Sequence, residues 1–332
     1  MQKDIRMQDR ATLPATAKVC IVIPCRNRAA TTLSCIESIH ASLIYDHYDV
    51  LVIDDGSSDG TSERIAATFP STIIVRGDGN LWWGGAVRVG IEHAFAAGYD
   101  RIVLLNDDCR PTAEAWNSLV QCSISDEDAV FLADIQSNHQ PPVRLNNALR
   151  LKHGKAQVNL DELSNATGQF VIFSSASVKK LGLPATRSCP HYYDGVLFPY
   201  WRRKGARIYR VNGALAVCEW DALRALEPYD RLLISPIGPI SYFRFCLFNQ
   251  KSRYKIATRT TQMCARHGGL KGTLLALVRF GIFTLQSLLA YLFRTIGRGE
   301  AEFRRRVGSL PDEALRNAVL SELKQGNSVT FS

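Results

Sequence analysis

The chain has 332 residues and is 46% apolar, so it can bury a sizeable core in one large domain or two modest ones. Its formal net charge is +9, and residues 244–299, with ten lysines or arginines and no acidic residue, account for that excess. Nucleic-acid-binding proteins are often basic throughout, whereas the excess positive charge of this chain is confined to one segment. We therefore expect no nucleic-acid partner. One basic, apolar-rich segment instead favours contact with an anionic membrane surface.

The nine cysteines are scattered along the chain, and no pair has CxxC spacing. An odd number, with several inside apolar runs, indicates a reduced compartment and no disulfide framework or zinc site. Residues 1–16 are polar and lack the apolar core of a signal peptide. We therefore expect a flexible lead-in over residues 1–16 and a cytoplasmic protein, peripheral on the cytosolic face of a membrane.

Strands and helices are predicted to alternate in the N-terminal half, from apolar runs that end in turn residues and from helical apolar spacing. In chain order they are a strand over 18–24, a helix from Thr31 or Thr32 to about Ser42, a strand over 49–55, a helix from Thr61, a strand over 71–75, a helix over 86–97, and strands over 101–105 and 165–173. This order predicts an α/β fold with a mostly parallel sheet and helices on both faces. We expect a catalytic domain over residues 17–225 and a helical, basic region over residues 226–332.

Polar side chains follow three of the predicted strands, at the sheet edge where ligands of such folds bind. They are Arg26, Asn27 and Arg28 after the first strand, Asp54 and Asp55 after the second, and Asn106, Asp107 and Asp108 after the fourth. Paired carboxylates suit a divalent cation with oxygen ligands, and hence a diphosphate. The alternative is an ordinary solvated turn, because Asn and Asp are common turn residues.

Two common nucleotide-binding motifs are missing after the first strand. Residues 24–28, Pro-Cys-Arg-Asn-Arg, replace the glycine-rich dinucleotide fingerprint, and no P-loop is present. NAD binding and ordinary ATPase or kinase chemistry are therefore disfavoured. A carboxylate pair after the second strand can bind a base or ribose, and the pair after the fourth can hold a metal that neutralises a leaving diphosphate.

Four segments resemble, in order and spacing, the motifs of one enzyme family. They are residues 22–28 (VIPCRNR), 52–61 (VIDDGSSDGT), 79–86 (GNLWWGGA) and 105–108 (LNDD). They are similar to inverting nucleotide-sugar glycosyltransferases of family 2 with the GT-A fold, especially the rhamnosyltransferase-like and galactofuranosyltransferase-like members that build bacterial surface polysaccharides. The resemblance implies transfer of a sugar from a UDP- or dTDP-sugar to a hydroxyl of a glycan or polyprenyl-diphosphate-linked acceptor.

The resemblance also implies roles for single residues. Asp54 and Asp55 would contact the base and ribose, Asp107 would lie near the ribose, and Asp108 would hold Mg²⁺ or Mn²⁺. The full donor-binding set would be Pro24, Arg26, Asn27, Arg28, Asp54, Asp55, Asn80, Trp82, Trp83, Gly84, Gly85, Arg88, Asn106 and Asp107. The alternatives are core packing for the two tryptophans and a solvated helix face for Arg88.

On the acceptor side, Asp194 resembles the family's catalytic carboxylate, which would accept the proton of the attacking hydroxyl. The alternative is a surface aspartate in a tyrosine-rich loop. Val196 stands where the family often has a second acid, and no histidine follows the strand over 211–217 to complete a metal site. Cys218, Glu219 or water remain as the third metal ligand, and His191 is disfavoured for that place.

The segment between Lys271 and Arg294 is long enough to span a bilayer, which takes roughly 20 apolar residues. Arg279 within the membrane core would cost about 2.5–3.5 kcal/mol. Because Arg279, Gln286 and Arg294 lie on one side of the predicted helix, we expect helices lying in the membrane interface. The alternative is a bundle packed on the catalytic domain.

Two rival functions remain open from the sequence. A nucleotidyltransferase would also use an α/β sheet and a metal, but it calls for a glycine-rich, lysine-bearing loop after the first strand. A non-catalytic adaptor would bind membrane or nucleic acid through residues 244–306.

Overall fold

A computed structural model describes residues 17–42, 48–140, 142–143, 160–163, 166–219, 222–226, 228–235, 238–249, 252 and 255–324. The predicted lead-in over residues 1–16 lies outside these ranges. The chain divides into an N-terminal unit, Met1–Gln136 with Arg144–Cys218, and a C-terminal unit, Ser137–Val143 with Glu219–Ser332. This division falls just before the domain boundary expected after residue 225.

The N-terminal unit contains one sheet and its flanking helices. Its elements are β1 (Val19–Cys25), α1 (Ala29–Ser42), β2 (Tyr48–Asp54), α2 (Thr61–Thr68), β3 (Ile73–Arg76), α3 (Trp82–Ala96), β4 (Arg101–Leu105), β5 (Cys109–Pro111), α4 (Ala113–Ser125), β6 (Ala129–Ser137), β7 (Leu160–Glu162), β8 (Phe170–Ser174), α5 (Ser175–Leu181), α6 (Asp194–Arg203) and β9 (Arg207–Cys218). The sheet order is β3-β2-β1-β4-β8-β6-β9-β5, with β7 beside β9. The predicted α/β class is confirmed.

The sheet is parallel on one side of β4 and antiparallel on the other. β1 pairs in parallel with β2 and β4, and β2 pairs in parallel with β3. The pairs β4–β8, β6–β8, β5–β9 and β7–β9 are antiparallel. The expectation of a mostly parallel sheet therefore holds only for β3-β2-β1-β4, because an apolar run predicts a strand but not its direction. In the parallel part, Cys25 lies level with Asp54, so β1 and β2 end at the same edge.

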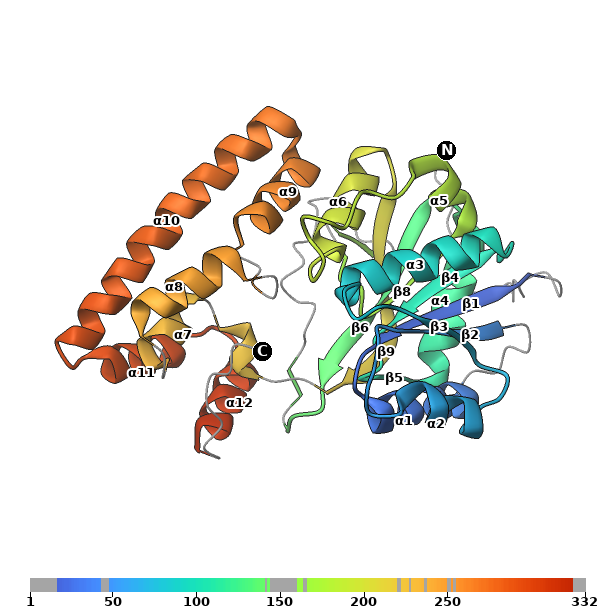
Figure 1. Cartoon of the computed structure of the whole chain (residues 1–332), viewed down its shortest axis with the longest axis horizontal. Helices are drawn as coiled ribbons and strands as arrows, with labels where there is room; N and C mark the ends of the chain where they lie inside the picture. Colours follow the sequence, from blue (N-terminus) through green and yellow to red (C-terminus); the bar gives the residue numbers. More distant parts are fainter. Residues whose placement is uncertain are drawn as a thin grey trace. The chain divides into compact units, whose positions relative to one another are not determined.

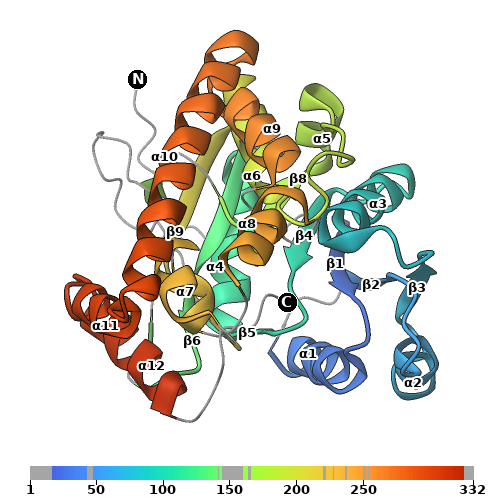
Figure 2. The ribbon, with the colours of Figure 1, turned by 60° about the vertical axis from the view of Figure 1, so that its left-hand side comes forward.

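Alternate residues of β1 face two different layers of helices. Ile21 and Ile23 belong to the core that includes Ile36 of α1, Ile65 of α2 and other residues from α4. Figures 1 and 2 both show α3 on the opposite side of β1 and β2.

Helix α3 comes close to the sheet at Gly90. A Cβ atom there would lie 2.2 Å from Cγ1 of Val22, whose side chain is branched and stiff. Glycine therefore allows α3 to pack directly on β1. This close packing fixes the position of the first turn of α3 relative to the sheet edge.

Several local expectations were wrong. Helix α1 begins at Ala29, so Thr32 lies inside it and its hydroxyl donates to the carbonyl of Arg28. Helix α3 begins at Trp82, not near Ala86, so both tryptophans lie in the first turn of a helix. The elements β5, α4 and β6 were not predicted. For β5, β6 and the start of α3, a partner distant in sequence supplies the stabilising contact.

The expectation that the cysteines are all reduced was also wrong. Cys109 and Cys218 form a disulfide across the antiparallel pair β5–β9, at a sequence separation of 109. The remaining seven cysteines are free thiols. Spacing rules could not reveal this pair, because the sheet alone brings the two residues together.

The C-terminal unit is helical, as expected. Its described elements are a 3-10 helix over Ala222–Ala225 and the helices α7 (Pro228–Ile234), α8 (Pro239–Phe248), α9 (Ile256–His267), α10 (Gly269–Thr295), α11 (Gly299–Gly308) and α12 (Glu313–Lys324). Helix α10 buries Ala276, Phe283 and Ala290 on one face, and the Phe283 ring stacks on Phe243 of α8 at 5.7 Å. By length and composition α10 could cross a membrane, and only 17% of its apolar stretch is buried.

Candidate functional site

Two arginines after β1 reach the ends of the strands on either side. Arg28 donates from Nε to Oδ2 of Asp107 at 2.8 Å, and its Nη2 lies 3.7 Å from Oδ2 of Asp108. Arg26 Nη1 lies 3.9 Å from Oδ2 of Asp55 and donates to the Gly79 carbonyl. The polar groups that follow β1, β2 and β4 therefore meet at one edge of the sheet.

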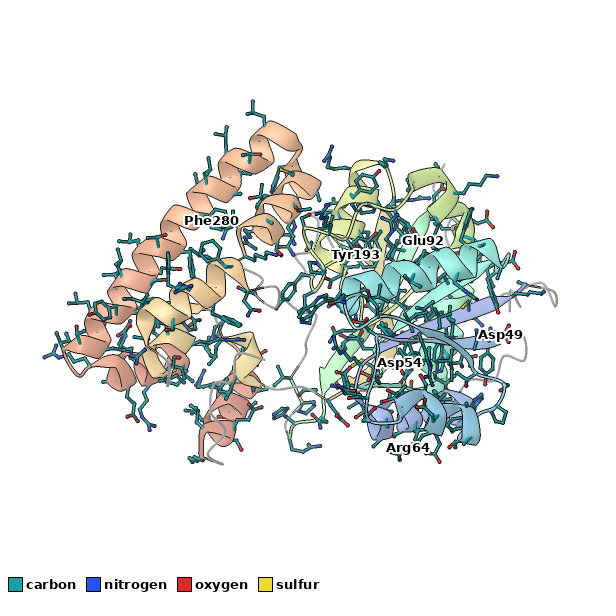
Figure 3. All side chains as sticks on the ribbon, in the orientation of Figure 1. Asp49, Asp54, Arg64, Glu92, Tyr193 and Phe280 are labelled. Atoms are coloured by element: carbon teal, nitrogen blue, oxygen red, sulfur yellow. A yellow bond between two sulfur atoms is a disulfide. The ribbon has the colours of Figure 1, made fainter. Side chains whose placement is uncertain are left out.

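The two carboxylates after β2 are buried and hold the segments around them. Asp54, labelled in Figure 3, accepts hydrogen bonds from the Ser57 N–H at 2.9 Å and from the Ser62 hydroxyl of α2. Asp55 accepts from the N–H groups of Leu81 at 3.0 Å and Trp82 at 2.8 Å, which begin α3. A carboxylate offers about four lone-pair positions. Both groups therefore keep lone pairs beyond those that hold the loops.

The loops after β2 and β3 touch through their backbones. Gly56 has φ +66°, and a Cβ atom there would lie 2.8 Å from the Gly79 nitrogen. Asn27 also has positive φ, and its side-chain oxygen accepts from the Ser58 N–H at 2.7 Å. Asn80 is exposed beside this contact. The loop after β1 is thereby tied to the other two.

The carboxylates after β4 differ in exposure. Asp107 is 6% exposed, and burial raises its pKa from 3.8 to about 6, against the opposing effect of the Arg28 guanidinium. The Thr32 hydroxyl also donates to it, at 3.2 Å. The Asp108 side chain is 26% exposed. Asp108 is therefore the more accessible of the two carboxylates, and Asp107 is the one that Arg28 and Thr32 hold in place.

The first turn of α3 joins the residues that follow β2 and β4 to the segment before α6. Trp82 has φ +57°, a left-handed conformation that is strained for a bulky residue, and strained residues are enriched at functional sites. Its ring lies 5.3 Å from that of His191. Trp83 donates from Nε1 to Oδ1 of Asn106 at 2.9 Å. Both tryptophans are partly exposed, so plain core packing does not describe them.

Asp194 is the first residue of α6 and connects to the same network. Its carboxylate accepts from the Gly195 N–H at 2.8 Å and, more weakly, from the Gly168 N–H at 3.4 Å. Gly168 lies against Trp83, because a Cβ atom there would be 2.3 Å from the indole ring. Contacts therefore run from Asn106 through Trp83 and Gly168 to Asp194. Figure 3 shows neighbouring Tyr193 beside α3.

Residues 20–182, about half of the chain, match the sequence family described as glycosyl transferase family 2. The N-terminal unit is a family 2 glycosyltransferase domain. This match confirms the family expected from the four sequence motifs. No curated protein matches the chain.

Several solved structures are similar to the chain. A mannosyltransferase from Pyrobaculum calidifontis, PcManGT, in complex with GDP-Man and Mn²⁺, is 16% identical, with 94% of this chain and 89% of that chain covered and a TM-score of 0.49. S. aureus TarS (residues 1–349) is 12% identical, with 93% and 92% covered and a TM-score of 0.48. GalNAc-T7 with UDP, GalNAc and Mn²⁺ is 13% identical, with a TM-score of 0.46. The alignment covers 61% of this chain but only 43% of GalNAc-T7.

Some expected site residues of the glycosyltransferase domain lie outside the network. Arg88 donates to the Glu92 carboxylate and to the Pro184 carbonyl, both at 2.8 Å, instead of facing the aspartates. Pro24 is buried within β1, opposite Ile53. Gly84 and Gly85 lie buried in the first turn of α3. Thr32 and Gly168 were not among the expected site residues.

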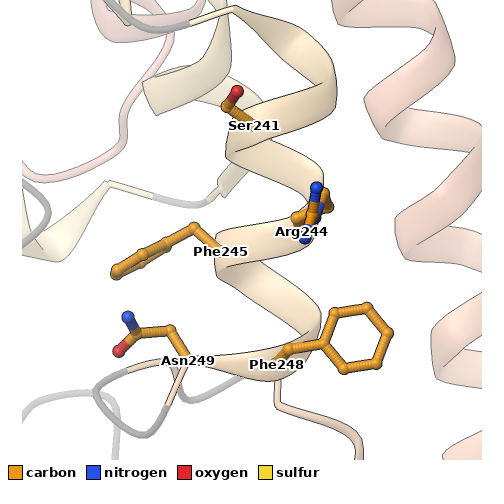
Figure 4. A pocket seen from close by; sticks show the side chains of 5 residues that line it. All are labelled: Ser241, Arg244, Phe245, Phe248 and Asn249. Carbon is orange, nitrogen blue, oxygen red and sulfur yellow. The ribbon is translucent and has the colours of Figure 1, made fainter.

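A pocket of about 510 Å³ lies on α8 in the C-terminal unit, lined by Ser241, Arg244, Phe245, Phe248 and Asn249 (Figure 4). It contains no carboxylate. The acidic residues at the sheet edge, and not this pocket, therefore form the candidate active site.

Asp107→Asn is expected to raise the melting temperature at pH 7.5 and to leave it nearly unchanged at pH 4. The Asp107 carboxyl has a pKa of about 6 in the folded chain, against an ordinary value of 3.8. Between these two pH values the folded state keeps a proton that the unfolded state has released, so the free energy of unfolding falls as pH rises. The amide avoids that loss, with an upper limit of about 3 kcal/mol. Circular dichroism melts at both pH values measure the effect.

Asp128→Asn is the matched control for this measurement. Its exposed carboxylate pairs with Lys180 at 2.8 Å, and such surface pairs contribute at most about 1 kcal/mol. A lower melting temperature for Asp107→Asn than for the wild type at pH 7.5 would contradict the raised pKa.

Proposed function

We propose that the protein is a metal-dependent, inverting glycosyltransferase. It moves a sugar from a nucleotide-diphosphate donor to a hydroxyl of a glycan or lipid-linked acceptor in the synthesis of bacterial surface polysaccharide. One observation carries this proposal: within a family 2 domain, Arg26 and Arg28 draw the carboxylates after β2 and β4 to one edge of the sheet.

The donor nucleotide binds at the ends of β1 and β2. Asp54 and Asp55 accept hydrogen bonds from the base and the ribose. The side chains of Arg26 and Arg28 are 47% and 40% exposed, so their guanidinium groups can also reach a diphosphate. Guanidinium groups bind phosphate oxygens in a bidentate manner, which positions the donor as well as neutralising it.

The chain offers oxygen ligands for a hard divalent cation at the end of β4. Asp108 is the partly exposed carboxylate there, and Asp107 and Asn106 lie beside it. This donor set suits Mg²⁺ or Mn²⁺. When bound, such an ion stabilises negative charge on a leaving diphosphate. Asp108 holds the ion, while Arg28 keeps Asp107 and Asp108 together.

The acceptor approaches from the side of α6. Asp194 accepts the proton of the attacking hydroxyl, and inversion follows when that hydroxyl attacks the anomeric carbon opposite the departing diphosphate. The partly exposed rings of Trp82 and His191 lie between the donor and acceptor sides and exclude water from the reacting sugar.

A nucleotide sugar with Mg²⁺ or Mn²⁺ is expected to stabilise the protein against heating. A donor at 100 times its Kd adds about 2.7 kcal/mol, which raises the melting temperature of a domain of this size by roughly 5–10 °C. A thermal-shift panel of UDP-, dTDP- and GDP-sugars with either metal makes the measurement. Asp108→Asn should lose the metal-dependent part of the shift, and Asp128→Asn should keep all of it. Absence of a shift with every donor would contradict the function.

Asp194→Asn is expected to keep donor affinity and to lose transfer. The amide oxygen can still accept from the Gly195 N–H, which makes the shorter of the two hydrogen bonds, so the start of α6 stays in place, but the amide takes no proton. General-base loss lowers kcat by about 10²–10⁴-fold. Steady-state kinetics with the donor found in the thermal-shift panel measure kcat and KM. If turnover survives at the wild-type rate, the base is another residue.

Helix α10 supports attachment to a membrane surface. Large apolar side chains remain exposed along it, including Leu274 (56%), Leu285 (60%) and Leu288 (60%). Lys271 and Arg279 are also exposed on this helix, and the surrounding segment has no acidic residue. An apolar helix face with basic residues around it binds the interface of anionic bilayers. We propose that the chain is peripheral on the cytosolic face of such a membrane.

The triple variant Leu274→Gln, Leu285→Gln and Leu288→Gln is expected to weaken binding to phosphatidylglycerol vesicles by at least about tenfold, because each buried leucine contributes roughly 1.5–3 kcal/mol. Vesicle sedimentation measures the binding. Phe95→Gln, which removes an exposed aromatic ring from α3, is the control and should bind as the wild type does. If cell membranes release the protein only into detergent, and not into carbonate or high salt, attachment is not interfacial.

A further inference from the structure

The disulfide Cys109–Cys218 lies directly beside the proposed metal ligand. Cys109 follows Asp108 in the chain, and Cys218 is the last residue of β9. The two cysteines face each other across β5 and β9, and both side chains are buried. A redox-sensitive bond therefore adjoins the carboxylate that the function depends on.

The two sulfur atoms and the carboxylate are close enough to share one ion. One ligand atom from each of Asp108, Cys109 and Cys218 lies within 4.8 Å of the others. Cys109 Sγ is 3.7 Å from Oδ1 of Asp108. Around a tetrahedral Zn²⁺, with Zn–S near 2.3 Å and Zn–O near 2.1 Å, ligand atoms lie roughly 3.5–3.8 Å apart. Small side-chain rotations bring the group to that spacing once the sulfurs are no longer bonded to each other.

We propose that reduction of this disulfide creates a second kind of metal site, with two thiolates and the Asp108 carboxylate, that binds Zn²⁺. Two molecules of a small thiol, or one dithiol, give two electrons and two protons to the bridge and become a disulfide. Cys109 and Cys218 become thiols. Zn²⁺ then replaces the two thiol protons, which pass to solvent, and water completes four ligands.

The chemistry of the ligands makes the site selective. Thiolate sulfur prefers Zn²⁺ and similar soft ions, whereas carboxylate and amide oxygens prefer Mg²⁺ and Mn²⁺. The oxidised chain presents only the oxygen ligands. The reduced chain presents both kinds. Arg28 lies 3.7 Å from Asp108, and Arg110 donates to the carbonyls of Asp107 and Cys109. Their positive charges balance the net negative charge that two thiolates and a carboxylate leave around one Zn²⁺.

The site goes beyond the proposed function, because zinc binding needs neither a donor nor transfer. Its consequence for catalysis does rest on that function. Two divalent cations on one carboxylate repel each other, so Zn²⁺ bound to the reduced chain competes with Mg²⁺ or Mn²⁺ for Asp108.

Titration of the full chain with Co²⁺, in oxidised and in reduced form, tests the proposal. Co²⁺ takes zinc sites, and a thiolate ligand gives it a sulfur-to-metal absorption band. The oxidised chain should show seven reactive thiols after denaturation and no such band, and the reduced chain nine thiols and a band that saturates at one equivalent. Zn²⁺ should abolish the band by displacing Co²⁺. Absence of the band in folded, reduced protein overturns the proposal, as does loss of the fold on reduction.

Variants identify the ligands. Cys109→Ser and Cys218→Ser should each lose the thiolate band or shift it to a one-sulfur spectrum, and Asp108→Asn should weaken Zn²⁺ binding at least tenfold in the reduced form. Cys122→Ser, which removes a free thiol from α4, is the matched control and should behave as the wild type does. An unchanged spectrum in Cys218→Ser overturns the assignment. If the buried cysteine variants do not fold, the wild-type redox comparison and Asp108→Asn still decide it.

Discussion

The ion pair between Arg28 and Asp107 is the contact on which the acidic edge of the sheet depends. A buried carboxylate is costly without a partner, and here the cation comes from the loop after the neighbouring strand. Arg28 also reaches Asp108, and Arg26 extends the same loop towards Asp55. Because β1 runs parallel to both β2 and β4, one short loop can hold the carboxylates on either side of it.

Several acidic residues at this edge have a structural task as well as the proposed chemical one. Asp54 holds the turn into α2, and Asp55 accepts the N–H groups that open α3. Helix termini leave backbone donors unpaired, and a carboxylate from another loop satisfies them here. Loss of Asp55 would therefore disturb the start of α3 and, with it, the contact between Trp83 and Asn106. A substitution at such a residue would therefore change local folding along with any effect on the proposed binding.

The sequence predicted much of this arrangement because its signals are local. Apolar runs that end in Asp54 and Asp107 marked β2 and β4 within a residue or two, and the motifs around them indicated the family. Strand direction on the far side of β4, the start of α3 at Trp82 and the Cys109–Cys218 bond were missed. Each of these depends on a residue far away in sequence, and local periodicity carries no information about such partners.

Crowding around α3 also determines which positions of this site can change during evolution or in a designed library. A side chain at Gly84 would meet the Pro190 carbonyl at 2.5 Å, and one at Gly168 would meet the Trp83 indole. These two positions are closed to diversification. Asn80 is exposed and His191 is partly exposed, so both can vary without rebuilding the backbone. New sugar preferences should therefore arise from substitutions at exposed positions such as Asn80 and His191, while the crowded positions Gly84 and Gly168 stay constant.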